Sequence, residues 1–238
     1  MKIGVIGANG VAATNRLLDM IERKVTAAGG FRDAHHPEML IAQATQVPSR
    51  SMFLEGRGAD WRPEYIELAK MFKREGCTAA CMCCNTAHYA INDVEQGSGL
   101  PFINLLNEVA KRVAALGLKK VELWVSDGAR KFDIYGPAFK EFAPECEICY
   151  PSPERQTMVT KVICAVKTKA RFLPETDSMH PHAMLRALLQ TAAAPVVLGC
   201  TDLRIAYRSD ERLDDGVVVD SLDTLADAIV EMHNKHVK

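Results

Sequence analysis

Short apolar segments alternate with amphipathic segments along the whole chain. The first apolar segment spans residues 2–7, and the helical segment after it places Leu17, Leu18 and Ile21 on one face, with Thr14 as the predicted cap. Further apolar segments, each predicted as a strand, span 39–45, 78–83, 101–104, 121–125, 147–150, 196–199 and 217–220. Helical patterns are predicted at 62–75, 107–116, 134–142, 156–172 and 182–193, and from 224 to the end.

This alternation predicts an α/β fold in which mostly parallel sheets are covered by helices on both faces. Ligands of such sheets bind beyond the carboxyl ends of the strands, where the loops that leave the strands meet. A strand followed by cysteine, threonine and a helix occurs twice, around Cys84 and around Cys200. The repetition suggests two related halves with similar loops.

Composition and charge narrow the class of protein. The 238 residues are 48% hydrophobic and 25% charged, which is ordinary for a globular protein with a core of normal size. The net charge of −1 gives no indication of a nucleic-acid partner. No apolar run approaches the length of about 18 residues that a membrane helix needs, and residues 1–7 are too short for a signal peptide. We therefore expect a cytoplasmic protein without a membrane segment.

Eight cysteines are present, and in a reducing compartment we expect them to be free thiols. Cys81 and Cys83 fall within a predicted strand and should be buried, whereas Cys84 and Cys200 stand where a strand gives way to a helix. Unpaired amides and the dipole at a helix start can lower a cysteine pKa from about 8.5 toward neutrality. Packing alone also explains a cysteine at a strand end, but two such sites favour reactive thiols at Cys84 and Cys200.

The two cysteine segments carry a resemblance to a known family. Cys-Asn-Thr-Ala-His at 84–88 and Gly-Cys-Thr-Asp-Leu at 199–203 resemble the two signature motifs of the aspartate/glutamate racemase family. The loops at 7–14 and 47–51 are similar to the glycine-rich and Pro-x-Arg-[Thr/Ser] loops of its aspartate racemase branch. The resemblance covers nearly the whole chain. It implies two similar Rossmann-like or flavodoxin-like halves facing each other across a cleft, formed by 1–97 with 208–238 and by 98–207.

The resemblance also implies a chemistry. Members of this family racemise aspartate, glutamate or a related amino acid without pyridoxal phosphate, and no feature of this sequence requires a cofactor or a metal ion. Cys84 and Cys200 would be the catalytic residues, one as a thiolate that removes the α-proton and the other as a thiol that protonates the opposite face. The partner is then a small amino-acid substrate, and by analogy we expect a homodimer.

Several polar residues near the two motifs are candidates for binding that substrate. Arg50 can pair bidentately with the side-chain carboxylate of the substrate, the distal carboxylate. The alternative is a solvated loop arginine without a role in binding. The hydroxyls of Thr86 and Thr201 can cap the helix starts. Residues expected to bind the α-carboxylate or the enolate charge are Asn9, Asn85, Thr86, Thr201 and Ser126. His88, one helical turn past Cys84, is a candidate for tuning its thiolate, and a packed or solvated histidine explains it equally well.

The sequence departs from the aspartate racemase pattern at several positions. Asn9 and Val11 replace the usual Met and Pro of the first loop. Ala129 lacks a hydroxyl that the branch carries, and Asp127 adds a negative charge beside it. Thr157 occupies the position where, by our alignment, the branch has a lysine that helps to hold the distal carboxylate. Residues that can supply the missing positive charge are Arg130, Lys131 and Lys161.

Three other interpretations remain open at this point. Related proteins catalyse hydantoin racemisation, maleate isomerisation or arylmalonate decarboxylation, and the presence of both cysteines argues against the one-cysteine decarboxylases. The Cys-x-x-Cys spacings at 81–84 and 146–149 also fit a structural zinc or dithiol site, without a surrounding glycine knuckle. Finally, altered loops around the cleft are consistent with a relative that binds an amino acid without turning it over.

Overall fold

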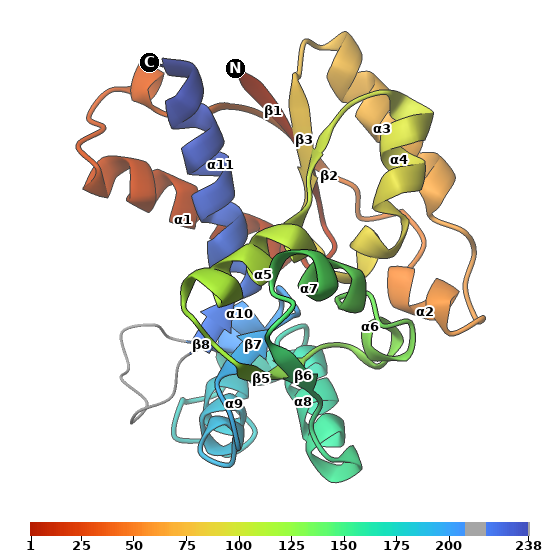
Figure 1. Cartoon of the computed structure of the whole chain (residues 1–238), viewed down its shortest axis with the longest axis vertical. Coiled ribbons are helices and arrows are strands. Elements are labelled where there is room, and N and C mark those ends of the chain that lie inside the picture. The colour runs from red at the N-terminus through yellow and green to blue at the C-terminus, as the bar shows by residue number, and fades with distance from the viewer. Residues whose placement is uncertain (208–217, 238) are drawn as a thin grey trace.

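Two four-stranded sheets, parallel throughout, form the framework of the molecule (Figure 1). The computed structural model describes residues 1–207 and 218–237. The first sheet has the order β2-β1-β3-β4, built from β1 (Lys2–Gly7), β2 (Glu38–Gln43), β3 (Ala79–Met82) and β4 (Phe102–Ile103). The second has the order β6-β5-β7-β8, built from β5 (Lys120–Trp124), β6 (Glu147–Cys149), β7 (Val196–Leu198) and β8 (Val218–Asp220). The strand orders correspond one to one, which confirms the predicted α/β class and the two related halves.

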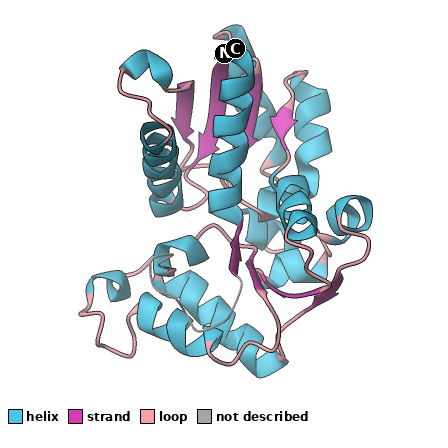
Figure 2. Ribbon diagram, turned by 60° about the vertical axis from the view of Figure 1, so that its left-hand side comes forward, coloured by secondary structure: helices cyan, strands magenta, loops and turns pink. Residues whose placement is uncertain are grey.

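Helices cover the sheets and join them (Figure 2). The longer ones are α1 (Val11–Ala27), α3 (Arg62–Arg74), α4 (Ile91–Ser98), α5 (Leu105–Ala115), α7 (Gly136–Phe142), α8 (Pro153–Ala165), α9 (Pro181–Leu189) and α11 (Ser221–Val237). The short ones are α2 (Arg50–Leu54), α6 (Asp127–Lys131), α10 (Leu203–Ala206) and the 3-10 helices η1 (Asp33–His35), η2 (Thr86–Ala90) and η3 (Lys169–Phe172). Over residues 1–207 and 218–237, no helix combines the length and apolar character that a membrane crossing requires.

Two strands belong to a different sheet from the one expected. The final strand was assigned to the first half, but β8 pairs with β7, with Val219 opposite Val197. The strand at 101–104 was assigned to the second half, but β4 pairs with β3, with Ile103 opposite Cys81. Both assignments were wrong because a short apolar strand does not specify its neighbour, which depends on the edge that the adjacent strand leaves open. Residues 208–217 of the expected first half lie outside the described residues.

Helix α11 packs against both α1 and α5, so the chain returns from the second sheet to the first half through this helix. Its buried residues Leu222, Leu225 and Ile229 belong to the largest apolar cluster of the described structure, which also contains Ile3 of β1 and Val121 of β5. This shared core joins the two halves.

The loop after β1 is held by a threonine inside the helix that follows. Helix α1 begins at Val11 with Gly10 as its N-cap, so the prediction that Thr14 caps this helix was wrong. The Thr14 hydroxyl instead donates to the Gly10 carbonyl (3.2 Å) and accepts from the Ala8 amide (3.0 Å). The first turn of α1 therefore lacks a side-chain cap, and the loop between β1 and α1 is held by hydrogen bonds from Thr14 inside the helix.

The helix predicted over 156–172 ends early. Helix α8 ends at Ala165, and the Thr168 hydroxyl donates to the Ala165 carbonyl (2.9 Å) and accepts from the Ala170 amide (3.2 Å). Threonine competes in this way with the helical hydrogen bonds of the backbone. The interruption separates α8 from η3 and places Lys167 in the turn between them.

Candidate active site

The two cysteine motifs come together where the sheets face each other. Cys84 follows β3 and Cys200 follows β7, each just beyond the carboxyl end of its strand. The Thr201 hydroxyl donates a hydrogen bond of 3.3 Å to the carbonyl oxygen of Cys83, which joins the second motif directly to the first. Cys83 is fully buried, as predicted, whereas Cys84 and Cys200 are partly exposed. The carboxyl ends of both sheets thus meet at one site.

Groups from the second half hold the loop that carries Cys84. The Tyr135 hydroxyl donates to Oδ1 of Asn85, and Nδ2 of Asn85 donates to the Ser221 hydroxyl (3.0 Å). The hydroxyls of Thr86 and Ser126 lie 3.2 Å apart and share a hydrogen bond. Several residues expected to bind substrate therefore also bind the two halves to each other.

The two threonines beside the cysteines do not act as helix caps. Thr86 contacts Ser126 and Thr201 contacts the Cys83 carbonyl, and neither η2 nor α10 has a side-chain cap. The capping prediction was wrong because both hydroxyls point across the junction between the halves. Helix α10 is also only four residues long, which leaves few aligned peptide dipoles to act on Cys200.

The Cys200 thiol is a weak acid in this structure. Although the residue as a whole is partly exposed, its pKa is raised from 9.0 to about 12, mainly by burial of the thiol and also by the charge of Asp202, while Lys167 acts in the opposite direction. Cys84 adds a smaller rise, which places it within electrostatic range of Cys200. The expectation of a lowered pKa was wrong for Cys200, because burial outweighs the short helix.

His88 supports the backbone of Cys84. The Leu105 amide donates to Nε2 of His88 (3.1 Å), so Nδ1 carries the proton and donates to the Cys84 carbonyl (2.8 Å). Burial lowers the pKa of His88 to about 4, and the ring is therefore neutral near pH 7. His88 contacts the carbonyl group of Cys84 and carries no charge that would stabilise a thiolate.

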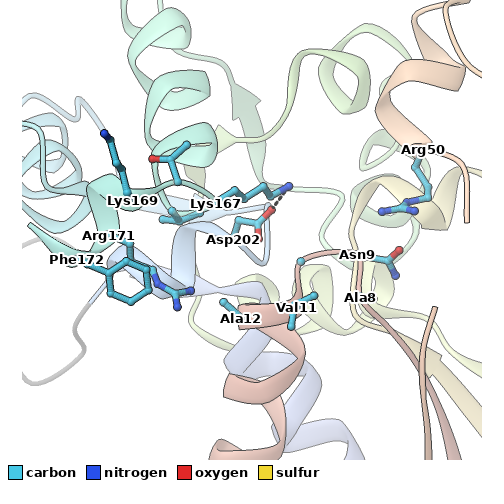
Figure 3. A pocket seen from close by; sticks show the side chains of 13 residues that line it. Ala8, Asn9, Val11, Ala12, Arg50, Lys167, Lys169, Arg171, Phe172 and Asp202 are labelled. Carbon is cyan, nitrogen blue, oxygen red and sulfur yellow. Dashed lines mark ion pairs between the residues drawn. The ribbon is translucent and has the colours of Figure 1, made fainter. Parts of the chain in front are cut away.

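A cavity of about 590 Å³ opens beside the second motif, which contributes Asp202 to the wall (Figure 3). The rest of the wall, as the described residues form it, comes from the loop after β1, Arg50, the turn after α8 and η3 with Lys169 and Arg171, and it includes neither Cys84 nor Cys200. Nζ of Lys167 lies 2.8 Å from Oδ2 of Asp202, and Arg50 faces this pair from the opposite side of the cavity. Asn9 and Arg50 were predicted as binding residues, whereas Lys167 and Asp202 were missed.

Asp202 is the buried member of this charged group. Burial raises its pKa, while Lys167 and Arg50 lower it. Burial lowers the pKa of Lys167, but Asp202 more than offsets that effect. A Cβ atom at Gly10 would overlap Oδ1 of Asp202, so a glycine is required for this close approach.

Asn9 is held by a second tyrosine. The Tyr65 hydroxyl donates to Oδ1 of Asn9, and Nδ2 of Asn9 donates to the Ile6 carbonyl (3.4 Å). Tyr65 is fully buried and packs edge-on against Trp61 at a centroid separation of 4.7 Å. The orientation of the Asn9 side chain at the cavity wall is therefore fixed by hydrogen bonds on both sides of its amide.

The three cations expected to replace the missing lysine lie elsewhere. Arg130 donates to the Pro151 carbonyl (3.3 Å), and the Lys131 ammonium lies 5.6 Å from the centre of the Phe132 ring. Lys161 lines a separate cavity together with Thr157. The wall of the first cavity, as the described residues form it, includes none of them, and Lys167, Lys169 and Arg171 supply positive charge there instead.

Two signals in the sequence pointed to the missed residues. Asp202 is part of the second motif, two positions after Cys200. Lys167 lies directly before Thr168, and the threonine side chain can compete for backbone groups and end a helix. No three His, Cys, Asp or Glu side chains are placed to hold a metal ion within residues 1–207 and 218–237.

Comparison with known proteins adds a family and a fold. A family model described as Asp/Glu/Hydantoin racemase matches residues 3–229. The structure is similar to an aspartate racemase from Picrophilus torridus, with a TM-score of 0.79 at 19% identity over 98% of this chain and 94% of the other. An aspartate racemase homologue from Pyrococcus horikoshii gives a TM-score of 0.72 at 21% identity, covering 98% and 99%. A glutamate racemase isoform from Bacillus anthracis gives 0.66 at 15% identity, covering 98% and 82%.

Proposed function

The chain belongs to the Asp/Glu/Hydantoin racemase family and is therefore an isomerase. We propose that it racemises an acidic amino acid. Cys84 and Cys200 are the proposed pair of bases, and the reaction needs no pyridoxal phosphate. The observation that supports the substrate class is the set of charges in the cavity beside the second motif.

That set is mainly positive and suits an anionic substrate. Arg50, Lys167, Lys169 and Arg171 supply positive charges, and the buried Asp202 supplies a negative charge. An acidic amino acid carries two carboxylates and one ammonium group, so each ligand charge has an opposite partner in the wall. A neutral hydantoin ring would leave the excess positive charge of the wall without a counterpart, which favours the amino acid over the related hydantoin reaction.

We propose that the loop before α1 receives the α-carboxylate. Val11 and Ala12 line the cavity, and the first turn of α1 has no side-chain cap. Backbone amides at a helix N-terminus bind anions, and they also stabilise the negative charge that moves onto the carboxylate as the α-proton leaves. The distal carboxylate then lies toward Arg50 and Lys167.

The proton transfers follow from the two sulfurs. One cysteine, as a thiolate, takes the α-hydrogen as a proton, and the electron pair of the C–H bond delocalises into the α-carboxylate. The other cysteine, as a thiol, returns a proton to the opposite face of the carbon. The high pKa of Cys200 favours the thiol form in the unliganded enzyme, with Lys167 available to stabilise its thiolate in the reverse direction. Each turnover exchanges the protonation states of the pair.

The test is exchange at the α-carbon. Purified protein in deuterated water is incubated with each enantiomer of aspartate and glutamate, and in parallel with alanine and with a hydantoin, followed by proton NMR and chiral chromatography. We expect loss of the α-proton signal together with inversion for at least one acidic amino acid from either enantiomer. Folded protein that exchanges none of them contradicts the proposal, and exchange of the hydantoin alone would reassign the substrate.

Two further predictions accompany this function. We propose that the protein acts in the cytoplasm and, by analogy with its family, that it forms a homodimer. Sedimentation equilibrium tests the assembly, and fractionation of cells tests the location.

A further inference from the structure

One buried tyrosine contacts both cysteine-bearing loops. Tyr135 lies directly before α7 and is 1% exposed. Its hydroxyl donates to Oδ1 of Asn85, the residue after Cys84. Its ring lies against Gly199, the residue before Cys200, where a Cβ atom would be only 3.1 Å from Cε2 of the ring.

The contact at Asn85 fixes the orientation of that amide. Oδ1 accepts from Tyr135 while Nδ2 donates to the Ser221 hydroxyl at 3.0 Å. All three side chains are at least nine-tenths buried, so water does not replace a missing partner without rearrangement. The position of the Cys84 loop therefore depends on a hydroxyl from the other half of the molecule.

The contact at Gly199 fixes the ring itself. A side chain at position 199 would also meet Val125 (2.5 Å) and Leu123 (3.0 Å), so the strand exit has room for glycine only. Burial raises the pKa of Tyr135 and Cys200 raises it further, which places the phenol near the second sulfur as well as near the first loop. The phenol is thus a neutral hydrogen-bond donor at neutral pH.

We propose that Tyr135 is a positioning residue that sets the placement of Cys84 relative to Cys200. The inference rests on the proposed two-cysteine racemisation. In that reaction both sulfurs must reach opposite faces of one carbon, and proton transfer requires contact distances of about 3–3.5 Å. A displacement of about 1 Å at either sulfur is expected to cost roughly 100-fold in rate. Tyr135 itself does not touch the substrate.

The kinetic test uses Tyr135→Phe, which removes the hydroxyl and keeps the ring against Gly199. We expect kcat to fall by roughly 10- to 100-fold with KM changed by less than about twofold, and the primary isotope effect with α-deuterated substrate to increase. Tyr150→Phe is the matched control, because it removes a tyrosine hydrogen bond to Asp133 (3.2 Å) in the same half. Its kinetics should equal those of the unmodified protein.

A second measurement needs no substrate and separates this inference from the proposed function. Iodoacetamide labelling followed by peptide mass spectrometry gives the reaction rate of Cys84, with the exposed Cys164 as an internal reference. In Tyr135→Phe the loop is released, and we expect Cys84 to react at least about fivefold faster while Cys164 is unchanged. If the unmodified protein racemises nothing, the proposed function fails, and the labelling still decides the role of Tyr135.

Ser221→Ala provides an independent variant, because it frees the other end of the Asn85 amide and leaves Tyr135 intact. We expect a smaller increase in Cys84 labelling, in the same direction. The proposal is overturned if folded Tyr135→Phe and Ser221→Ala both label Cys84 at the rate of the unmodified protein. It is equally overturned if Tyr135→Phe raises KM and leaves kcat unchanged.

Discussion

Nζ of Lys167 lies 2.8 Å from Oδ2 of Asp202, and the two side chains differ sharply in exposure, at 53% and 5%. The carboxylate is fixed in the protein, with the backbone of Gly10 against it, whereas the ammonium group extends into the cavity. A partly exposed lysine has several rotamers available, so it can contact a ligand without leaving its counter-ion completely. This arrangement places a mobile positive charge opposite Arg50.

Replacing Lys167 by methionine removes that charge and preserves the length of the side chain. We expect KM for the acidic substrate to rise by roughly 10- to 100-fold, because a charge-assisted hydrogen bond contributes about 1.5–3 kcal/mol. Steady-state kinetics with aspartate and glutamate measure the effect. Lys161→Met is the matched control on the preceding helix, since Lys161 lines a different cavity, and its KM should not change. An unchanged KM in Lys167→Met would remove Lys167 from the binding site.

Opposite changes in the pKa of Cys200 should follow from substituting the two members of this ion pair. Asp202 raises the pKa of the Cys200 thiol and Lys167 lowers it. Asp202→Asn therefore shifts the pH dependence of Cys200 alkylation toward lower pH, and Lys167→Met shifts it toward higher pH. Peptide mass spectrometry after timed iodoacetamide labelling between pH 7 and pH 11 gives both profiles. Shifts of the same sign in the two variants would contradict this electrostatic picture.

The pattern of strands and the two motifs could be predicted from the sequence because both are local. Apolar segments ending in Cys84 and Cys200 indicated their positions at strand ends without knowledge of the neighbours. The partner of β8 could not be predicted, because it depends on which sheet edge is open after β7 has paired with β5. Pairing is a property of the whole sheet, and the segment at 217–220 contains no information about it.

The chemistry of the site was only partly predictable for a similar reason. The helix starts beside the cysteines suggested lowered pKa values, but burial dominates at Cys200 and acts with the opposite sign. The hydroxyls of Thr86 and Thr201 were predicted to cap local helix starts, whereas their partners in the structure come from distant segments. Tyr135 had no local signal at all, since its contacts lie 50 and 64 positions away in the sequence, at Asn85 and Gly199.

The two-base mechanism makes a separate prediction for each cysteine. Cys84→Ala and Cys200→Ala should each lose racemisation by roughly 10²- to 10⁴-fold, because each removes one of two required proton-transfer groups. Chiral chromatography of aspartate and glutamate reactions measures the loss. Cys164→Ala replaces an exposed cysteine outside the site and should retain full activity.

The single-cysteine variants also discriminate between the two faces of the substrate. A variant with one remaining cysteine can still remove and replace the α-proton on the face of the substrate that this cysteine contacts, without inversion. We therefore expect residual deuterium incorporation into only one enantiomer for Cys84→Ala, and into only the other for Cys200→Ala, by proton NMR. Racemisation retained in either alanine variant would exclude the two-base scheme.

The stability of the protein should decrease below neutral pH because of His88. Its pKa is lowered from 6.5 to about 4 in the folded state by burial, so below pH 6.5 the unfolded chain binds the proton first. Stability rises with pH wherever the unfolded state binds more protons, and this contribution is therefore lost as pH falls from about 6.5 to about 4. At 1.36 kcal/mol per pKa unit, the loss is about 3 kcal/mol.

Urea unfolding at pH 7 and at pH 4.5 measures this loss, and His88→Gln identifies its source. The variant is less stable at pH 7, because Gln does not reproduce both hydrogen bonds of the ring, to Cys84 and to Leu105. Its stability should nevertheless fall less between the two pH values than that of the unmodified protein. Asp220, whose pKa is raised to about 6 by burial, favours the folded state as pH falls and contributes equally to both proteins, so it cancels in the comparison. His236→Gln, at an exposed position, is the control and should keep the original pH dependence. If stability falls with pH in His88→Gln as it does in the unmodified protein, the His88 ring is not buried in the neutral form.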